Sequence, residues 1–123
     1  MTDLKQALEE VYRDCQNLGW DGYGAPPVTL KTLIKAKEFL AALPINRTKN
    51  LEFSAEPSGD ISFDWWDRAN CQIGLGIDAL GRITYASRFD SARVRGTEIF
   101  NITEGIPPQI TMILDRFYSK DGV

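Results

Sequence analysis

Residues 61–87 read ISFDWWDRANCQIGLGIDALGRITYAS, and this stretch decides the fold. Apolar residues alternate with polar or small residues in three runs, at 61–66, 71–78 and 82–87. Alternation with a period of two is typical of strands that bury one face, and short glycine-bearing turns are typical of antiparallel hairpins. The stretch therefore predicts three consecutive strands. Their expected inward residues are Ile61, Phe63, Trp65, Cys71, Ile73, Leu75, Ile77, Ile83, Tyr85 and Ser87.

The same pattern extends the sheet on both sides. Residues 51–55 alternate in the same way and lead into the turn sequence Pro57-Ser58-Gly59. Residues 92–100 are expected to add a fifth strand at the edge. The sequence thus predicts an antiparallel meander of four to five strands.

Two helices are expected before the sheet and one after it. Residues 3–18 and about 29–43 have apolar residues at the i, i+3, i+4, i+7 spacing of an amphipathic helix, and Pro107-Pro108 opens the third helix. The expected stripe of the first helix is Leu4, Ala7, Leu8, Val11, Tyr12, Cys15 and Leu18. That of the second is Leu33, Ala36, Leu40 and Leu43, widened by Leu30, Ile34 and Phe39. Ile110, Ile113, Leu114 and Phe117 line the third.

The expected helix ends follow from residue chemistry. Asp3 suits the start of the first helix and Gly19 its end, while Thr29 caps the second helix and Pro44 ends it. A single layer of helices on one face of the sheet would bury every apolar stripe. We therefore expect a single α+β domain over residues 1–123, with the helices packed on one sheet face.

Composition limits the class of protein, its expected location and its expected partners. The chain has 123 residues, 43% of them apolar and 25% charged, which is ordinary for one globular domain. No apolar run approaches the ~20 residues that span a bilayer, and the N-terminus lacks a signal-peptide core, so we expect a cytoplasmic protein without a membrane partner. The net charge of −3 argues against nucleic acid as a partner. Cys15 and Cys71 form no Cys-x-x-Cys pair and are expected to be buried and unbonded.

The chain contains no histidine, which excludes several chemistries. Nucleophile pairs of the serine–histidine and cysteine–histidine kinds cannot form within it, and the commonest metal ligand is missing. There is no phosphate-binding P-loop, and the spacing of Gly19, Gly22 and Gly24 is not that of a dinucleotide-binding motif. We therefore expect no metal, no cofactor and no catalytic residues, and a non-enzymatic role is favoured.

Charged residues on the outward sheet face allow more than one interpretation. The carboxylates are Glu52, Glu56, Asp60 and Asp64. A pair of them could share acid and base duties as in glycosidases, but a solvated polar face is the favoured explanation, because nothing in the sequence indicates a cleft that would shift their pKa values. The arginines are Arg82, Arg88, Arg93 and Arg95. They either bind a phosphate or an acidic partner, or are ordinary exposed charges.

The pair Trp65-Trp66 is the most informative local feature. Neighbouring strand residues point to opposite faces, so an inward Trp65 leaves Trp66 on the outer face. The expected neighbours of Trp66 there are Ser62, Gly74, Gly76, Thr84 and Ala86, ringed by Asp64, Asp67, Arg82 and Arg88. Such a set resembles a protein-contact patch, in which Trp and Arg are enriched. Alternatively, Trp66 lies at a sheet end and only caps the core.

The loop Trp20-Asp21-Gly22-Tyr23-Gly24-Ala25 joins the first two helices. Its glycines suggest backbone angles that other residues disfavour, and its aromatic residues are expected to fold back onto the core and lock the helices together. Alternatively, the loop binds a small anionic ligand through its backbone N–H groups, with Trp20, Asp21, Gly22, Tyr23 and Gly24 as the site.

This loop also carries a resemblance. Together with Phe39-Leu40, Leu43-Pro44 and the string Glu56-Pro57-Ser58-Gly59-Asp60-Ile61 ahead of Trp65, it resembles a largely uncharacterised family of short bacterial and phage-borne proteins. The resemblance covers about the first two-thirds of the chain. It implies a bacterial or phage cytosolic context and assigns no chemistry.

Three functions remain as hypotheses. The first is a non-enzymatic protein that binds and inhibits or neutralises another protein, such as an antitoxin, an immunity protein or an anti-CRISPR protein, through Trp66 with Asp64 and Asp67. The second is a sensor of an anionic metabolite or nucleotide, or a minimal enzyme, that uses the Trp20–Ala25 loop. The third is a homo-oligomer that associates through the outer sheet face or the edge strand.

Overall fold

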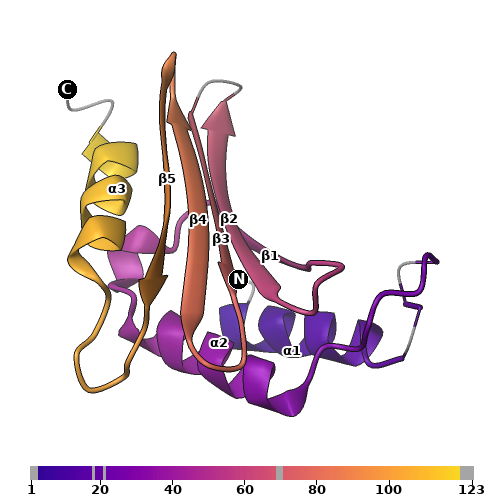
Figure 1. Cartoon of the computed structure of the whole chain (residues 1–123). Coiled ribbons are helices and arrows are strands. Elements are labelled where there is room, and N and C mark those ends of the chain that lie inside the picture. Colours follow the sequence, from indigo (N-terminus) through magenta and orange to yellow (C-terminus); the bar gives the residue numbers. More distant parts are fainter. Residues whose placement is uncertain (1–2, 18, 21, 69–70, 120–123) are drawn as a thin grey trace.

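The computed structural model describes residues 3–17, 19–20, 22–68 and 71–119, which form an α+β fold (Figure 1). The helices are α1 (Leu4–Asp14), α2 (Leu30–Ala42), the 3-10 helix η1 (Ile45–Arg47) and α3 (Pro108–Ser119). The strands are β1 (Leu51–Ala55), β2 (Ile61–Arg68), β3 (Cys71–Ile77), β4 (Arg82–Phe89) and β5 (Ala92–Ile99). The predicted order of elements and the predicted fifth strand are both confirmed.

The strands form one antiparallel sheet in the order β1-β2-β3-β4-β5, so each strand pairs with its neighbour in sequence. Helix α1 packs on α2 and β1, α2 packs on β2 and β3, and α3 packs on β3. Figure 1 shows α1 and α2 side by side across one end of the sheet and α3 running along the strands. The helices cover one face, as predicted, and the opposite face is called the outer face below.

Aromatic side chains join the helices to the sheet. The ring of Phe39 on α2 meets Phe63 on β2 edge to face at 5.2 Å between centroids, and it meets Phe100, after β5, in the same way at 5.3 Å. Edge-to-face pairs add about 0.5–1.5 kcal/mol to the burial of apolar area. Phe39 therefore ties the second helix both to the middle of the sheet and to the segment that leads to α3.

Trp65 lies at the centre of the core. Its side chain is fully buried, and its register partners on the neighbouring strands are Leu51 and Ile73. The indole Nε1 donates to the backbone carbonyl of Arg47 in η1 at 2.9 Å. A buried indole needs a partner for its one polar atom, and the 3-10 helix supplies it.

The N-terminal helix differs from the prediction at its end. Asp3 caps α1 by accepting from the backbone N–H of Lys5, but the helix stops at Asp14 and does not continue to residue 18. Cys15 has non-helical backbone angles of φ −119° and ψ 31°, and its carbonyl accepts from Val28 N at 2.8 Å. Cys15 is nevertheless buried, and the expected stripe residue Leu18 lies outside the described residues.

The second helix has a narrower buried stripe than predicted. Thr29 caps it by accepting from Thr32 N at 3.2 Å, and it ends just before Leu43-Pro44, as expected. Leu30 and Ile34 were expected to widen the stripe, but they are 56% and 47% exposed. Leu30 and Ile34 lie on an exposed side of α2, and Thr32, about two hundred degrees round the helix, is buried instead.

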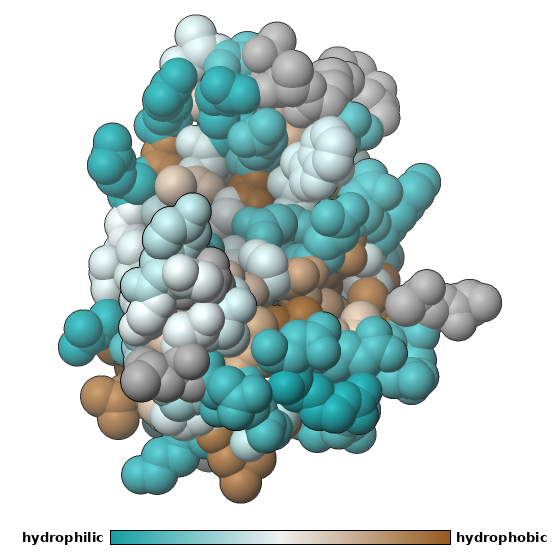
Figure 2. Space-filling model, turned by 90° about the vertical axis from the view of Figure 1, so that its right-hand side faces the viewer, coloured by the Kyte–Doolittle hydropathy of each residue, from teal (hydrophilic) through white to brown (hydrophobic). Residues whose placement is uncertain are grey.

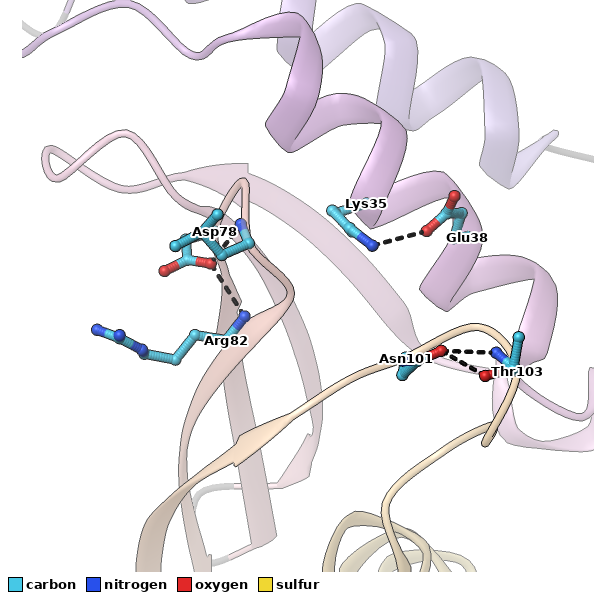
Figure 3. Close-up of polar contacts among 7 residues, drawn as sticks. Lys35, Glu38, Asp78, Arg82, Asn101 and Thr103 are labelled. Atoms are coloured by element: carbon cyan, nitrogen blue, oxygen red, sulfur yellow. Dashed lines mark hydrogen bonds and ion pairs between the residues drawn. The ribbon is translucent and has the colours of Figure 1, made fainter.

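The turn between β3 and β4 is built on Asp78 and Gly81. The Asp78 Oδ1 atom accepts from the backbone N–H groups of Leu80 and Arg82, each at 2.9 Å (Figure 3). Gly81 has φ +85°, and its carbonyl accepts from Phe100 N at 2.7 Å. The turn is thereby joined to the segment between β5 and α3, in which Asn101 Oδ1 accepts from Thr103 N and Oγ1 (Figure 3).

The surface is mixed. Figure 2 shows hydrophilic side chains over most of one side of the molecule, with apolar atoms reaching the surface between them. Exposed single apolar residues of this kind are normal for a folded protein.

Candidate functional site

A groove crosses the outer face of the sheet. It has a volume of about 830 Å³, and residues from all five strands line it. We call it the outer groove. The side chains on the outer face that line it are Glu52, Ser54, Asp64, Trp66, Gln72, Gly74, Ala86, Arg88, Arg93 and Arg95. Its volume falls within the range of about 300–1,000 Å³ that is usual for ligand sites.

Strand register arranges nine of these ten residues in two rows across the sheet, and Ser54 lies in the next row, opposite Ser62. The first row runs from β5 to β1 through Arg95, Ala86, Gly74, Asp64 and Glu52. The second runs from β5 to β2 through Arg93, Arg88, Gln72 and Trp66. Positive charge thus gathers over β4 and β5, and negative charge over β1 and β2.

Trp66 forms a wall of the outer groove. It is 51% exposed, whereas the neighbouring Trp65 is 0% exposed, so the prediction that the two indoles take opposite faces is confirmed. Its register partner on β3 is Gln72, and Gln72 in turn lies opposite Arg88. The indole therefore presents a large apolar surface beside polar side chains that can hydrogen-bond.

Small residues keep the floor of the groove open. Gly74 and Ala86 lie opposite each other in the middle of the first row. A Cβ atom on Gly74 would lie 3.4 Å from Asp64 Oδ1, which is ordinary van der Waals contact, so a larger side chain there would enter the groove without displacing the backbone.

Asp64 is held in a defined orientation. Its carboxylate accepts from the Ser62 hydroxyl at 3.0 and 3.1 Å and from the Ser54 hydroxyl at 3.3 Å. Burial raises the pKa of Asp64, and the nearby carboxylate of Glu52 raises it further, against the two serine hydrogen bonds, which lower it. The ionised carboxylate is therefore costly in the free protein, and a basic group placed beside it would relieve that cost.

This pKa shift predicts how an Asp64→Asn variant responds to pH. Because the pKa is raised above the ordinary value near 3.8, the stabilising effect of Asp64 is present at low pH and is lost as pH rises through the shifted pKa. At pH 7 the variant should be more stable than the parent by on the order of 0.5 kcal/mol, because the group is partly solvated. Urea unfolding should show this difference shrinking toward pH 4, and a pH-independent difference would contradict the assignment.

The arginine side of the groove carries like charges in contact positions. Arg88 and Arg93 are direct cross-strand partners, and Arg95 is the next outward residue on β5. Like charges directly opposite each other destabilise a sheet. Arg93 and Arg95 are exposed, and no ion pair joins either of them to another residue within the described part of the chain.

Not all of the predicted contact set comes together. Trp66, Asp64 and Arg88 share the groove, and Asp67 is exposed next to Trp66, where the register of β2 shifts. Arg82 does not join them, because it precedes Arg88 by six residues on the same strand, a separation of about 20 Å. It lies instead near Asp60, whose pKa is raised by burial first, then by Asp78, and lowered by Arg82.

Sequence reasoning missed how Arg93 and Arg95 reach Trp66. It grouped them with Arg82 and Arg88 in one basic cluster and left them out of the Trp66 contact set, but the pairing of Phe89 with Ala92 folds β5 directly back along β4 and sets Arg93 beside Arg88. The signal was present in the two residues Asp90-Ser91, since a two-residue turn fixes the register of a hairpin. Glu52 was considered only as a possible partner in a carboxylate pair, and Gln72 was not part of any predicted site.

The Trp20–Ala25 loop is closed by its own hydrogen bonds. Trp20 packs on the core and donates from Nε1 to the Pro26 carbonyl at 2.8 Å. Gly19 N donates to Ala25 O, and Gly22 N donates to Gly19 O, so these two amides are already used. Gly19, Gly22 and Gly24 have positive φ, as predicted.

The prediction for Tyr23 is wrong. It was expected to fold back onto the core, but its side chain is 92% exposed, because Gly22 and Gly24 on either side turn the chain tip outward. Asp21, which also belongs to the alternative ligand site, lies outside the described residues.

The described residues also bear on metal binding, disulfide bonding and membrane crossing. Within the described ranges, no group of three or more His, Cys, Asp or Glu side chains is placed to hold a metal ion. Cys15 and Cys71 are buried and not disulfide-bonded, as expected. Among the described helices, none has both the length and the apolar character that crossing a membrane would require.

Comparisons with protein-family models, with curated proteins and with solved structures find no match to this chain.

Proposed function

We propose that this protein is a non-enzymatic binding protein whose outer groove receives a segment of a partner protein and thereby inhibits or neutralises that partner. Antitoxins, immunity proteins and phage counter-defence factors of the anti-CRISPR type act in this way. The resemblance of the Trp20–Ala25 loop favours the cytoplasm of a bacterium or of a phage-infected cell as the setting.

The observation that carries the proposal is the half-exposed indole of Trp66 in an open groove lined by arginines. Tryptophan and arginine are the residues most enriched among binding hot spots, because they combine a large contact area with directed hydrogen bonds. Gly74 and Ala86 leave room above the sheet for an incoming side chain. The lack of histidine supports a binding role over acid–base catalysis.

The groove supports the protein-binding hypothesis better than the loop supports a ligand site. The loop amides of Gly19 and Gly22 already donate within the loop, which reduces what it offers an anion. The outer groove, by contrast, is open along its length. It has arginines at one end and carboxylates at the other, which suits a segment of a polypeptide chain that enters from the side.

Two glycines of one strand provide the test. Gly74 lines the groove, whereas Gly76, on the same face of β3, pairs with Ser62 and Thr84 beyond the lining residues. Neither has positive φ, and a Cβ on Gly76 would have its nearest neighbour at 3.7 Å. Valine suits a strand at both positions. Gly74→Val should weaken partner binding at least about 100-fold by filling the site, and Gly76→Val should change it less than about threefold.

The measurement is affinity capture from cells of the source organism with the parent protein and both valine variants. The proposal expects a protein that the parent and Gly76→Val recover and Gly74→Val does not, and whose activity falls when the parent is added. Equal recovery by the two variants, or no loss of activity in the captured protein, would argue against the proposed function. Circular dichroism of both variants controls for folding.

A further inference from the structure

The outer groove has a direction, because its two ends carry opposite charges. Within the first row, Arg95 lies on β5, while Asp64 and Glu52 lie on β2 and β1. Strands in a sheet are about 4.8 Å apart, so Arg95 and Asp64 are separated by three intervals, or about 14 Å. Between them the floor consists only of Gly74 and Ala86.

The two ends of the outer groove bring side chains of like charge together. At the basic end, Arg93 and Arg95 make no ion pair with another described residue, and Arg93 faces Arg88 directly. At the acidic end, Asp64 is partly buried next to Glu52, and its hydrogen bonds come from neutral hydroxyls. A ligand with an anion at one end and a cation at the other would relieve both like-charge contacts.

The width of the groove fits an extended chain. Apart from Ser54, the outward lining residues come from two neighbouring rows, which are two residues or about 7 Å apart along the strands. An α-helix with its side chains is about 10–12 Å across, so it would not reach the floor of the groove. The groove runs across the strands, so the occupant contacts side chains and does not add a strand to the sheet.

We infer that the outer groove recognises an extended segment of a partner protein that carries an acidic residue and a basic residue about four positions apart. The acidic residue contacts Arg93 and Arg95, the basic residue contacts Asp64 and Glu52, and the side chain next to the basic residue stacks on Trp66, which lies on β2 with Asp64. This inference rests on the proposed function and adds to it the chemistry of the bound segment.

Two other occupants fit less well. A nucleic acid strand repeats its negative charge along its length, and Asp64 and Glu52 would repel it from half of the groove. A second copy of this chain would oppose one concave face to another, which leaves its groove unfilled. A protein segment is therefore the occupant that fits the outer groove best.

The test is a selection from a random 12-residue peptide library on the immobilised full-length protein. Clones that also bind Gly74→Val are discarded, so that those retained depend on the groove. The retained clones should share an acidic and a basic residue about four positions apart. Selection on the double variant Arg93→Glu/Arg95→Glu, whose changed side chains are exposed, should instead yield clones without the acidic residue.

An exchange of charge between the protein and the peptide gives a quantitative test of binding. The double variant should bind the best parent peptide at least about tenfold more weakly, and changing the peptide's acidic residue to lysine should restore most of that loss. Groove-dependent clones without the charge pair would overturn this inference and leave the proposed function intact. No groove-dependent clones at all would overturn both.

Two controls address the other occupants. Tight binding of oligo-uridine or oligo-thymidine that Gly74→Val abolishes would overturn the inference in favour of a nucleic acid. Light scattering that shows a dimer of the parent, and a monomer of Gly74→Val, would overturn it in favour of a second copy.

Discussion

Trp65→Ala is expected to lower the free energy of unfolding by about 3–5 kcal/mol, which is the usual cost of removing a large buried aromatic side chain. Trp65 is fully buried, and its ring lies 6.4 Å from that of Phe63 between centroids. The change also removes the donor to the carbonyl of Arg47 and so loosens η1 from the sheet. Because small domains have a total stability of about 5–15 kcal/mol, the loss is a large fraction of the whole.

The adjacent Trp66 is the matched control. Trp66→Ala removes an equally large side chain from the same strand, but it is half-exposed, so the loss should stay below about 1 kcal/mol. Urea unfolding followed by far-ultraviolet circular dichroism measures both variants. Similar losses for the two tryptophans would contradict the assignment of opposite faces. Trp66→Ala should instead weaken partner binding, which Trp65→Phe should leave intact.

Gly81→Ala is expected to lower the free energy of unfolding by at least about 3 kcal/mol, for two reasons that add together. Gly81 has φ +85°, a conformation in which other residues are strained. In addition, a Cβ atom there would lie 2.6 Å from the carbonyl oxygen of Phe100, which is a backbone atom. Moving Phe100 away would break its hydrogen bond to Gly81 O and withdraw its ring from Phe39.

Gly105→Ala separates the two causes. Gly105 has a similar φ of +78°, but a Cβ atom there would have no neighbour within 4 Å. Gly105→Ala should therefore lower the free energy of unfolding by about 1 kcal/mol, the cost of the backbone conformation alone. Thermal and urea unfolding of both variants give the comparison. Equal losses would mean that the contact with Phe100 relaxes without cost.

The sheet could be predicted because one signal dominates it. Within the runs 51–55, 61–66, 71–78 and 82–87 apolar residues alternate with polar or small ones, and the period of two assigns each side chain to a face. The helices were harder at their ends. The first stops at Asp14, and the carbonyl of its C-cap residue Cys15 accepts from Val28 N, a contact between distant residues that no local pattern reports. Leu30 and Ile34 show that apolar residues near a stripe need not belong to it.

The candidate site could be predicted only in part, for a physical reason. Alternation gave the outward position of Trp66, but distances along the outer face depend on register, which is set by turns. The sequence analysis therefore placed Arg82 in the contact set, although register separates it from Trp66, and it did not bring Arg93 and Arg95 to that site. The depth of the groove depends on how the five strands twist together, and the alternation of residue types does not predict that twist.

The strand order β1-β2-β3-β4-β5 has a consequence for how the chain reaches this state. Every strand finds its partner a few residues further along, so each pairing closes a short loop at a small entropic cost. A sheet of this topology has a lower contact order than a Greek-key sandwich of equal length and is expected to fold faster. Successive hairpins can also form as the polypeptide leaves the ribosome, before α3 has been synthesised to cover them.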